Sequence, residues 1–337
     1  MKLRRPATLI IAAAALAVLF PACLLAGAVH IPAADVWHAL CGHATERDVW
    51  GVIVRDIRVP MAVTAALGGM SLAVAGLLMQ TLFHNPLAGP SIMGISSGAS
   101  LGVAIVVLAG VGGGAAMSVA TLAGALVGAL AIMALLLAIS AVVRSAAMLL
   151  IVGVLTGYVS SSAISLLNFF APQQSVHAYM LWGLGNFSGV SAAEMPWFAL
   201  LTCAFTLAAM LYVKPLDALL LGERYAENMG VSLQRVRAGI MLAGGALTAV
   251  VTAWCGPIAF IGLAVPHIAR LALGTSAHRW LLPATALTGA ATGLLTALLS
   301  VLPSQWGVLP VNAITPLLGV PVILYIILNG RKIAYFN

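Results

Sequence analysis

The stretch from Pro60 to Leu82, PMAVTAALGGMSLAVAGLLMQTL, is 23 residues long and contains no charged residue. About 20 apolar residues in a helix cross the hydrocarbon core of a bilayer, so this stretch predicts a membrane-spanning helix. Similar runs recur along the chain, and the predicted spans are 8–28, 60–82, 92–110, 115–139, 146–169, 193–213, 237–255, 258–273, 281–301 and 309–329. We therefore expect an all-α integral membrane protein with about ten transmembrane helices, forming one domain over residues 1–337.

The composition is typical of a protein whose solvent is lipid. Of the 337 residues, 62% are hydrophobic and only 7% are charged, whereas a soluble domain carries about a quarter of charged residues. The first 28 residues have a basic start and an apolar run, like a signal peptide. Because that run is long for a signal peptide and no convincing cleavage site follows it, we expect it to be retained as the first span.

The basic residues test the order of the spans. With the N-terminus in the cytoplasm and alternating spans, twelve of the fifteen basic residues fall on the inner side: Lys2, Arg4, Arg5, Arg144, Lys214, Arg224, Arg235, Arg237, Arg270, Arg279, Arg331 and Lys332. Only Arg47, Arg55 and Arg58 fall on the outer side. This partition follows the positive-inside rule and predicts that both termini are cytoplasmic. It also explains the net charge of +7 without a nucleic-acid partner.

Two connections are too long to be simple turns. The outer one covers about residues 30–59 and contains Trp37 and Trp50. The inner one, about residues 214–237, reads KPLDALLLGERYAENMGVSLQRVR and predicts two short amphipathic helices interrupted by Gly222 and Gly230. It could be a solvated loop, but its leucines, Met229 and Val231 indicate a surface on which another protein docks.

The sequence lacks the features of several transporter and enzyme classes. No Asp, Glu, Lys or Arg lies deep within a predicted span, although ion-coupled secondary transporters usually need such groups. No GxxxxGK[ST] loop is present, so energy for active transport must come from another polypeptide. His38, Cys41 and His43 in the outer connection, and His177, have no strong metal-ligand spacing. We expect no metal site and no bound cofactor; a secondary transporter and, more distantly, a channel remain alternatives.

Four segments and the start of the last span resemble the FecCD-type permeases of ATP-binding cassette importers, which take up iron-siderophores, haem and cobalamin. The segments are RDIRVP (55–60), MQTLFHNPLAGPSIMGISSGASLG (79–102), LGERYAENMGV (221–231), CGPIAFIGLAVPHIARLALGTSAHRWLLPATALTGA (255–290) and, in the last span, LPVNAITPLLGVPVILYII. Their joint order and spacing make the resemblance specific. In the first segment Met61 replaces a family arginine, and a second family arginine before the last span is absent.

The resemblance implies the architecture of a type II importer permease in the bacterial inner membrane. It implies a homodimer with two cytoplasmic ATPase subunits, which bind ATP and Mg, and an extracytoplasmic substrate-binding protein. The chain itself would be non-catalytic. The implied cargo is a metal chelate, with an iron-siderophore or haem favoured and cobalamin next.

The same resemblance assigns roles to residues. The ATPase-coupling residues are Leu221, Gly222, Glu223, Arg224, Ala226, Met229 and Gly230; the cytoplasmic gate is Asn85, Pro86, Leu87 and Ser145; the translocation path includes Tyr158, Ser161, Ser162 and Asn168; and Arg58 docks the binding protein. His267 and His278 are expected to be structural. Simpler alternatives exist for each set: a helix-breaking turn at Asn85, hydroxyls bonded to their own helix, and Arg58 anchoring a helix end at the headgroups.

Overall fold

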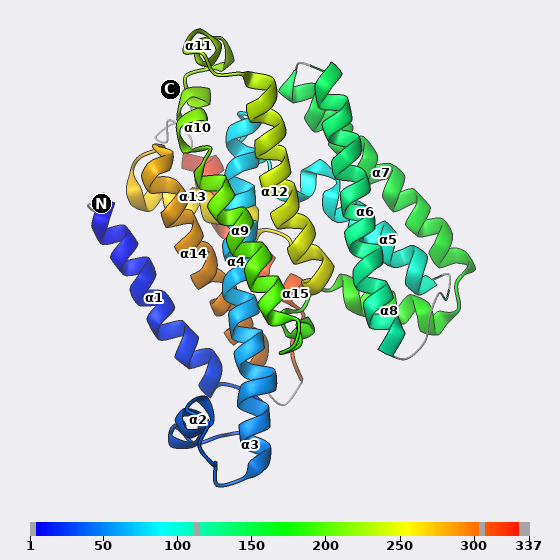
Figure 1. Ribbon diagram of the computed structural model, residues 1–337, viewed down its shortest axis with the longest axis vertical. Coiled ribbons are helices and arrows are strands. Elements are labelled where there is room, and N and C mark those ends of the chain that lie inside the picture. The colour runs from blue at the N-terminus through cyan, green and yellow to red at the C-terminus, as the bar shows by residue number, and fades with distance from the viewer. Residues whose placement is uncertain (1–4, 109, 111–114, 144, 303–306, 330–337) are drawn as a thin grey trace.

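The computed structural model describes residues 5–108, 110, 115–143, 145–302 and 307–329. Within these ranges every regular element is a helix (Figure 1). The elements are α1 (Arg5–Leu25), α2 (Ala33–Leu40), α3 (Asp48–Val52), the π-helix η1 (Ile53–Arg58), α4 (Val59–Leu82), the 3₁₀ turn η2 (Pro90–Met93), α5 (Ile95–Leu108), α6 (Ala115–Val142), α7 (Ala146–Phe170), α8 (Gln173–Gly183), the 3₁₀ turn η3 (Phe187–Gly189), α9 (Met195–Met210), α10 (Val213–Leu220), α11 (Glu223–Asn228), α12 (Leu233–Cys255), α13 (Ile261–Leu273), α14 (His278–Val301) and α15 (Val311–Asn329).

The helices agree with the predicted spans. Six are long and apolar enough to cross a membrane; α9 and α10, bent by 52° at the break between them, pass the same test only when they are taken as one span. The shorter apolar helices α5, α13 and α15 occupy the other three predicted positions. Two details were not predicted. The outer connection is largely helical and runs through η1 directly into α4, and α8 occupies a segment expected to be a simple connection.

The π-helix has a local cause in the sequence. Pro60 has no amide N–H, so the carbonyl of Asp56 cannot receive the α-helical hydrogen bond from residue 60. Wider π-type bonding just before the proline keeps this part of the chain helical. The helix that begins at Asp48 therefore extends α4 well beyond the bundle (Figure 1).

The bundle has two distinct ends. α11 lies at one end and α2 with α3 at the opposite end (Figure 1). Seven basic residues predicted to be on the inner side are described, and each lies in a helix near its α11 end: Arg5, Lys214, Arg224, Arg235, Arg237, Arg270 and Arg279. The three predicted to be on the outer side, Arg47, Arg55 and Arg58, lie beside α2 and α3. Five of the predicted inner residues, Lys2, Arg4, Arg144, Arg331 and Lys332, lie outside the described residues. The segregation of charge agrees with the predicted order of spans.

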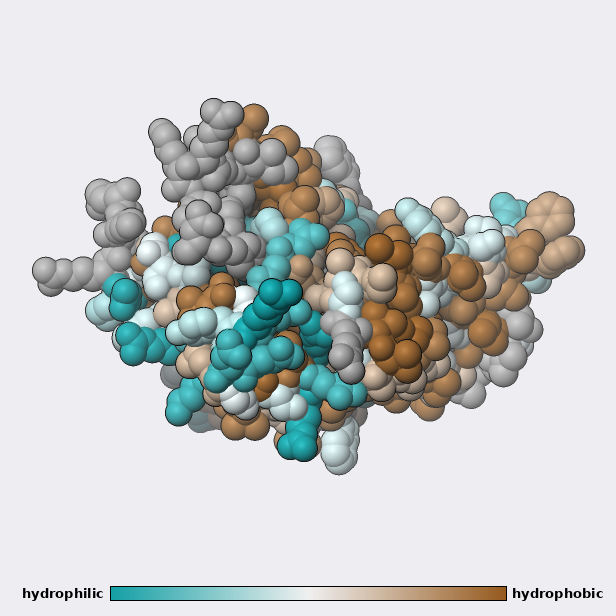
Figure 2. Space-filling model, turned by 90° about the horizontal axis from the view of Figure 1, so that it is seen from above, coloured by the Kyte–Doolittle hydropathy of each residue, from teal (hydrophilic) through white to brown (hydrophobic). Residues whose placement is uncertain are grey.

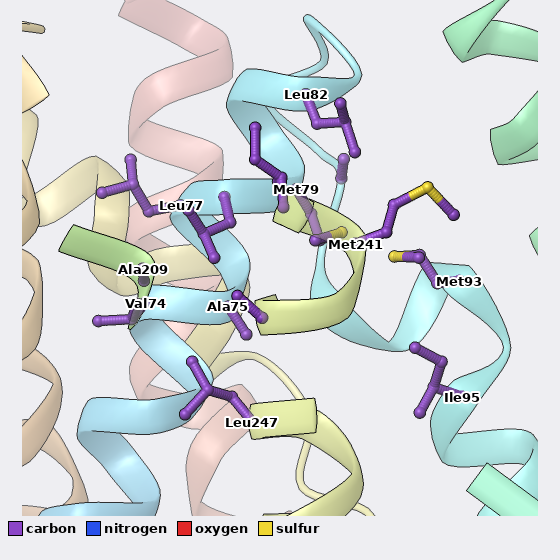
Figure 3. Close-up of a cluster of buried hydrophobic side chains, with 14 of the residues drawn as sticks. Val74, Ala75, Leu77, Met79, Leu82, Met93, Ile95, Ala209, Met241 and Leu247 are labelled. Carbon is purple, nitrogen blue, oxygen red and sulfur yellow. The ribbon is translucent and has the colours of Figure 1, made fainter. Parts of the chain in front are cut away.

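α4 is the central helix, in contact with α9, α12, α13 and α14. Figure 3 shows its apolar side chains meeting those of the neighbouring helices: Val74, Ala75, Leu77, Met79 and Leu82 of α4 with Ala209 of α9 and Met241 and Leu247 of α12. On its other side α4 approaches α13 through glycine. A Cβ placed on Gly76 would lie only 1.7 Å from the carbonyl oxygen of Gly262, so the two backbones are in direct contact.

The chain after α4 turns back into the bundle. Gly262 of α13 is packed against Pro90 of η2 and against the carbonyl of Leu72. Since Leu72 lies ten residues before the end of α4, Pro90 is roughly 15 Å inside that end along the helix axis. α5 therefore starts within the bundle. Its first turn follows Gly94, which has a φ of +74° and packs on Gly153 of α7.

Candidate functional site

The turn that follows α4, residues 83–89, is compact and points toward the α11 end. We refer to it as the gate turn. His84 adopts a left-handed conformation with φ of +47°. The Asn85 Oδ1 accepts a hydrogen bond from the amide of Leu87 at 2.9 Å, which closes an Asx turn over Pro86. Leu87 is 47% exposed, so an apolar side chain stands at the surface of a polar turn.

Buried polar side chains of α4 and α13 hold the gate turn. His267 Nε2 donates to the carbonyl of Pro86 at 2.7 Å, since a carbonyl can only accept. Gln80 receives a hydrogen bond from Arg270 Nη1 at 2.7 Å and donates to the Leu263 carbonyl at 3.1 Å. Gln80, His267 and Arg270 are all buried. A buried polar network of this kind fixes the turn in one position, because breaking it would strand polar groups.

A second group of contacts joins the end of α4 to α10. The Asp217 carboxylate accepts from both the backbone amide and the Nδ1 of His278, each at 2.8 Å. The Nε2 of His278 lies 3.0 Å from the Thr81 hydroxyl of α4. His84 Nε2 donates to the carbonyl of Leu219 at 2.7 Å. The expectation that His278 is structural therefore has a specific geometry: its ring lies between α4 and α10.

The segment from α10 to α11 has the predicted form of two short helices broken by glycine. Gly222, at the break, has a φ of +104°, and Gly230, after α11, has a φ of +83°; both conformations favour glycine. Glu223 forms a salt bridge with Arg237 of α12, which ties α11 to the bundle.

The exposed side of this segment differs in part from the predicted one. Leu221 before the glycine break, Tyr225 within α11 and Met229 at the C-terminal end of α11 are all exposed apolar side chains, and we refer to them together as the α11 stripe. Arg224 is also exposed. Ala226, predicted to be an ATPase-coupling residue, is fully buried on the face of α11 that packs against the core of the bundle. Tyr225 was not predicted, although its spacing of four residues from Met229 in the same helical segment was a usable signal.

A groove of about 600 Å³ lies beside the α11 stripe. It is lined by the end of α6 at Ser140, by Glu227 of α11, and by Gln234 and Arg237 at the start of α12. Figure 2 views this end of the molecule and shows hydrophilic residues gathered in one region, with hydrophobic surface beside them. A groove next to an apolar stripe is a suitable shape for receiving a helix or loop of another protein.

The predicted path residues lie on an uncovered side of α7. Tyr158, Ser161 and Ser162 are exposed, and Asn168 is partly buried with its amide bonded to the carbonyl of Ile164. The opposite side of α7 packs on α5 and η2. Ser145 caps the start of α7, where its hydroxyl accepts from the amide of Met148 at 3.4 Å. Among the described residues, α7 thus presents aromatic and hydroxyl groups on a surface with no partner helix from this subunit.

Arg58 is turned into the protein. Only 4% exposed, it donates from Nη1 to the carbonyls of Leu24, at 2.7 Å, and Leu25, at 3.1 Å, and from Nη2 to the carbonyl of Val29. These carbonyls lie at and just beyond the C-terminus of α1, where a cation is favoured by the helix dipole. The side chain therefore anchors a helix end within the subunit. Docking of a binding protein by Arg58 stays a prediction.

The histidines of the outer connection form no larger cluster. The rings of His38 and His43 are 6.2 Å apart, edge to face. In the part of the chain that the structure describes, no three His, Cys, Asp or Glu side chains gather in a way that could hold a metal ion.

The similarity of this chain to known proteins extends over nearly its whole length. The sequence pattern of the FecCD transport family matches residues 15–329.

The chain belongs to the FecCD transport family.

Two curated relatives of this FecCD permease have transport names. A hemin transport system permease of Yersinia pestis is 31% identical over 311 residues, which cover 91% of this chain and 90% of the relative. A vitamin B12 import system permease of Shigella boydii is 34% identical over 309 residues, covering 92% and 93%. A solved structure of an ABC transporter assigned to the metal-chelate type, in an inward-facing conformation, has a TM-score of 0.83 at 24% identity. That match covers 97% of this FecCD permease and 99% of the other chain and supports the fold.

Proposed function

We propose that this chain is the permease subunit of an ATP-driven importer for a metal chelate in the bacterial inner membrane. The observation that carries the proposal is the α11 stripe: an exposed apolar surface on a segment bonded directly to the gate turn. An apolar stripe at a polar end of a membrane protein needs a protein partner. Cytoplasmic ATPase subunits fit that requirement, and they bind the ATP and Mg that this chain has no motif to hold.

The proposed mechanism is alternating access in a homodimer with cytoplasmic termini. An extracytoplasmic binding protein delivers cargo at the α2 end, and nucleotide-driven closure of the ATPases displaces α10 and α11. The coupling residues would be Leu221, Gly222, Glu223, Arg224, Met229 and Gly230, with Tyr225 added and with Ala226 acting as support. The gate would be Asn85, Pro86, Leu87 and Ser145, and the path would follow Tyr158, Ser161, Ser162 and Asn168.

The cargo class follows from the relatives and from the surface of α7. The two relatives are named for hemin and vitamin B12 transport, both of which are large metal chelates. The exposed face of α7 combines Tyr158 with small hydroxyl residues. No residue of α7 is charged, so this face offers an amphipathic chelate apolar and weak polar contacts instead of a charged binding site. An iron-siderophore or haem is favoured, and cobalamin is next.

The test is uptake into liposomes that contain the permease with the ATPase that copurifies with it. Haemin, a ferric hydroxamate siderophore and cyanocobalamin are supplied outside with the cognate binding protein, and ATP or a non-hydrolysable analogue is enclosed. Uptake of one chelate when ATP is enclosed, and no uptake when the non-hydrolysable analogue is enclosed, supports the proposal. Uptake driven by a proton or sodium gradient without the ATPase would overturn it in favour of a secondary transporter.

A matched pair of variants tests the ATPase surface. Met229→Glu places a charge in the α11 stripe, and Val49→Glu places one on a similarly exposed apolar residue at the α2 end; the two native side chains are 61% and 65% exposed. We expect Met229→Glu to lose the copurifying ATPase and Val49→Glu to retain it. Equal retention by both variants would show that the ATPases bind elsewhere.

A further inference from the structure

Two polar connections join α10 to the last turn of α4 and to the gate turn that follows it, and neither belongs to the α11 stripe or to the α7 face. The first runs from Asp217 through His278 to Thr81. The second runs from the carbonyl of Leu219 to His84. α10 also packs on α4 and α14. The first connection reaches Thr81 in the last turn of α4, and the second reaches His84 within the gate turn, directly before Asn85.

The first connection is built around a buried imidazole. An ionised carboxylate can only accept hydrogen bonds, so the Nδ1 of His278 carries a proton toward Asp217 and its Nε2 faces Thr81. His278 and Thr81 have no exposed surface. Asp217 additionally accepts the backbone amide of His278, which fixes the first turn of α14 as well. A displacement of α10 must therefore carry the imidazole with it or leave a fully buried imidazole without its carboxylate partner.

The second connection ends at the break between the two coupling helices. The carbonyl of Leu219 accepts from His84 Nε2 at 2.7 Å and also from the amide of Gly222 at 2.9 Å. His84 is one of two non-glycine residues with positive φ among the described residues, the other being Phe260. A non-glycine residue keeps such a conformation when the surrounding structure holds it. The bond to Leu219 holds His84 in that conformation, and the gate turn continues at the next residue with Asn85.

We infer that Thr81, His84, Asp217 and His278 are positioning residues that transmit a displacement of α10 to the gate turn. The inference rests on the proposed function, because it names how the ATPase-driven movement reaches Asn85 and Leu87. The two connections act in parallel, one on the last turn of α4 at Thr81 and one on the gate turn itself at His84. A contact made only by apolar packing could slide, whereas these hydrogen bonds set the register of α10 against α4.

The test measures the gate turn directly. Leu87→Cys is introduced in a background with Cys41→Ser and Cys203→Ser, since the other two cysteines are buried. In inverted vesicles with the bound ATPase, labelling by a membrane-impermeant maleimide is compared without nucleotide and after trapping with ADP and vanadate. We expect the labelling rate of the parent protein to differ between these states by about fivefold or more.

Thr81→Val and Thr202→Val form a matched pair. Both threonines are fully buried and both hydroxyls donate to the carbonyl four residues earlier, Leu77 and Phe198. Only Thr81 also contacts His278. We expect Thr81→Val to reduce the nucleotide-dependent change to less than about twofold while ATP hydrolysis continues, and Thr202→Val to keep the full change. Equal behaviour of the two variants would overturn the first connection.

His84→Gly and His84→Gln separate the side chain from the backbone. Glycine keeps the positive φ and removes the bond to Leu219, so the gate response should be lost while the turn still forms. Glutamine restores a donor of similar reach and should recover part of the response. A full response in His84→Gly would overturn the second connection. If the parent protein shows no nucleotide-dependent change in labelling, the proposed function fails. If the parent and every variant show the same nucleotide-dependent change, the proposed function stands and the inference about these four residues fails.

Discussion

The contact between Gly76 and Gly262 allows a quantitative prediction for Gly76→Ala. The added Cβ would lie 1.7 Å from the carbonyl oxygen of Gly262 and 2.8 Å from its Cα. Both are backbone atoms and cannot rotate away, so α4 and α13 must separate by about 1.5 Å to reach normal packing distance. Overpacking in a close-packed core costs about 1–3 kcal/mol, and the absence of a flexible neighbour places this case at the upper end.

The substitution also has a small favourable term. Alanine is better than glycine within a helix by about 0.5–1 kcal/mol, so the net loss of stability should be about 2 kcal/mol. The separation moves His267 away from the Pro86 carbonyl, which loosens the gate turn as well. The assay is thermal unfolding of the detergent-solubilised protein, followed by loss of the monodisperse peak in size-exclusion chromatography.

Gly157→Ala is the matched control. Gly157 also lies in the middle of a membrane helix, but a Cβ added there would meet the Ser97 hydroxyl oxygen as its nearest atom at 3.5 Å, which is ordinary contact. We expect Gly76→Ala to unfold several degrees below the wild type and Gly157→Ala to unfold at or slightly above it. Equal transition temperatures for the two variants would refute the claim that α4 and α13 are in direct backbone contact at Gly76 and Gly262.

Two further substitutions test anchors at the α2 end. Arg58→Met removes the donors to three carbonyls at the end of α1, and should destabilise the protein by about 2–4 kcal/mol; unchanged thermal stability together with lost affinity for the binding protein would instead support a docking role. Asn312→Leu removes donors to the carbonyls of Gly183 and Pro257 and an acceptor for the amide of Ala259. This variant should lower the free energy of unfolding by about 1–3 kcal/mol, and protease added on the outer side should cut the connections around Gly183 and Pro257 faster than in the wild type. A variant with normal stability and normal protease resistance would contradict this prediction.

The sequence was sufficient for features that depend on one segment and its solvent. Charge-free runs must be helical in lipid because every backbone polar group needs a partner, so the apolar helices at the ten predicted positions were predictable from local composition. The two glycine-broken helices before α12 were predictable for a similar reason, since Gly222 and Gly230 interrupt an amphipathic pattern. The gate turn was located from Asn85 and Pro86 because these residue types form turns wherever they occur together.

The side on which a residue is buried was not predictable in the same way. Ala226 and Tyr225 are adjacent in a short helix, and only the packing of α11 on the bundle determines that the alanine is buried and the tyrosine exposed. Arg58 was predicted to dock the binding protein or to anchor a helix end at the headgroups, and nothing in the sequence indicated that its side chain is buried. Its guanidinium is buried because α1, more than 30 residues earlier, ends with free carbonyls beside it.

The local sequence thus determined which segments cross the membrane, where they break and which end carries the positive charge. These properties follow from the transfer of each residue between water and lipid. Tertiary structure decided that Asp217, His278, Thr81 and His84, from three separate helices and a turn, meet around the end of α4. Thr81 and His278 are 197 positions apart, so the hydrogen bond between them forms only when their helices pack closely. Close packing depends on glycine contacts between helices, and the sequence of one helix does not show which glycine of another helix it will meet.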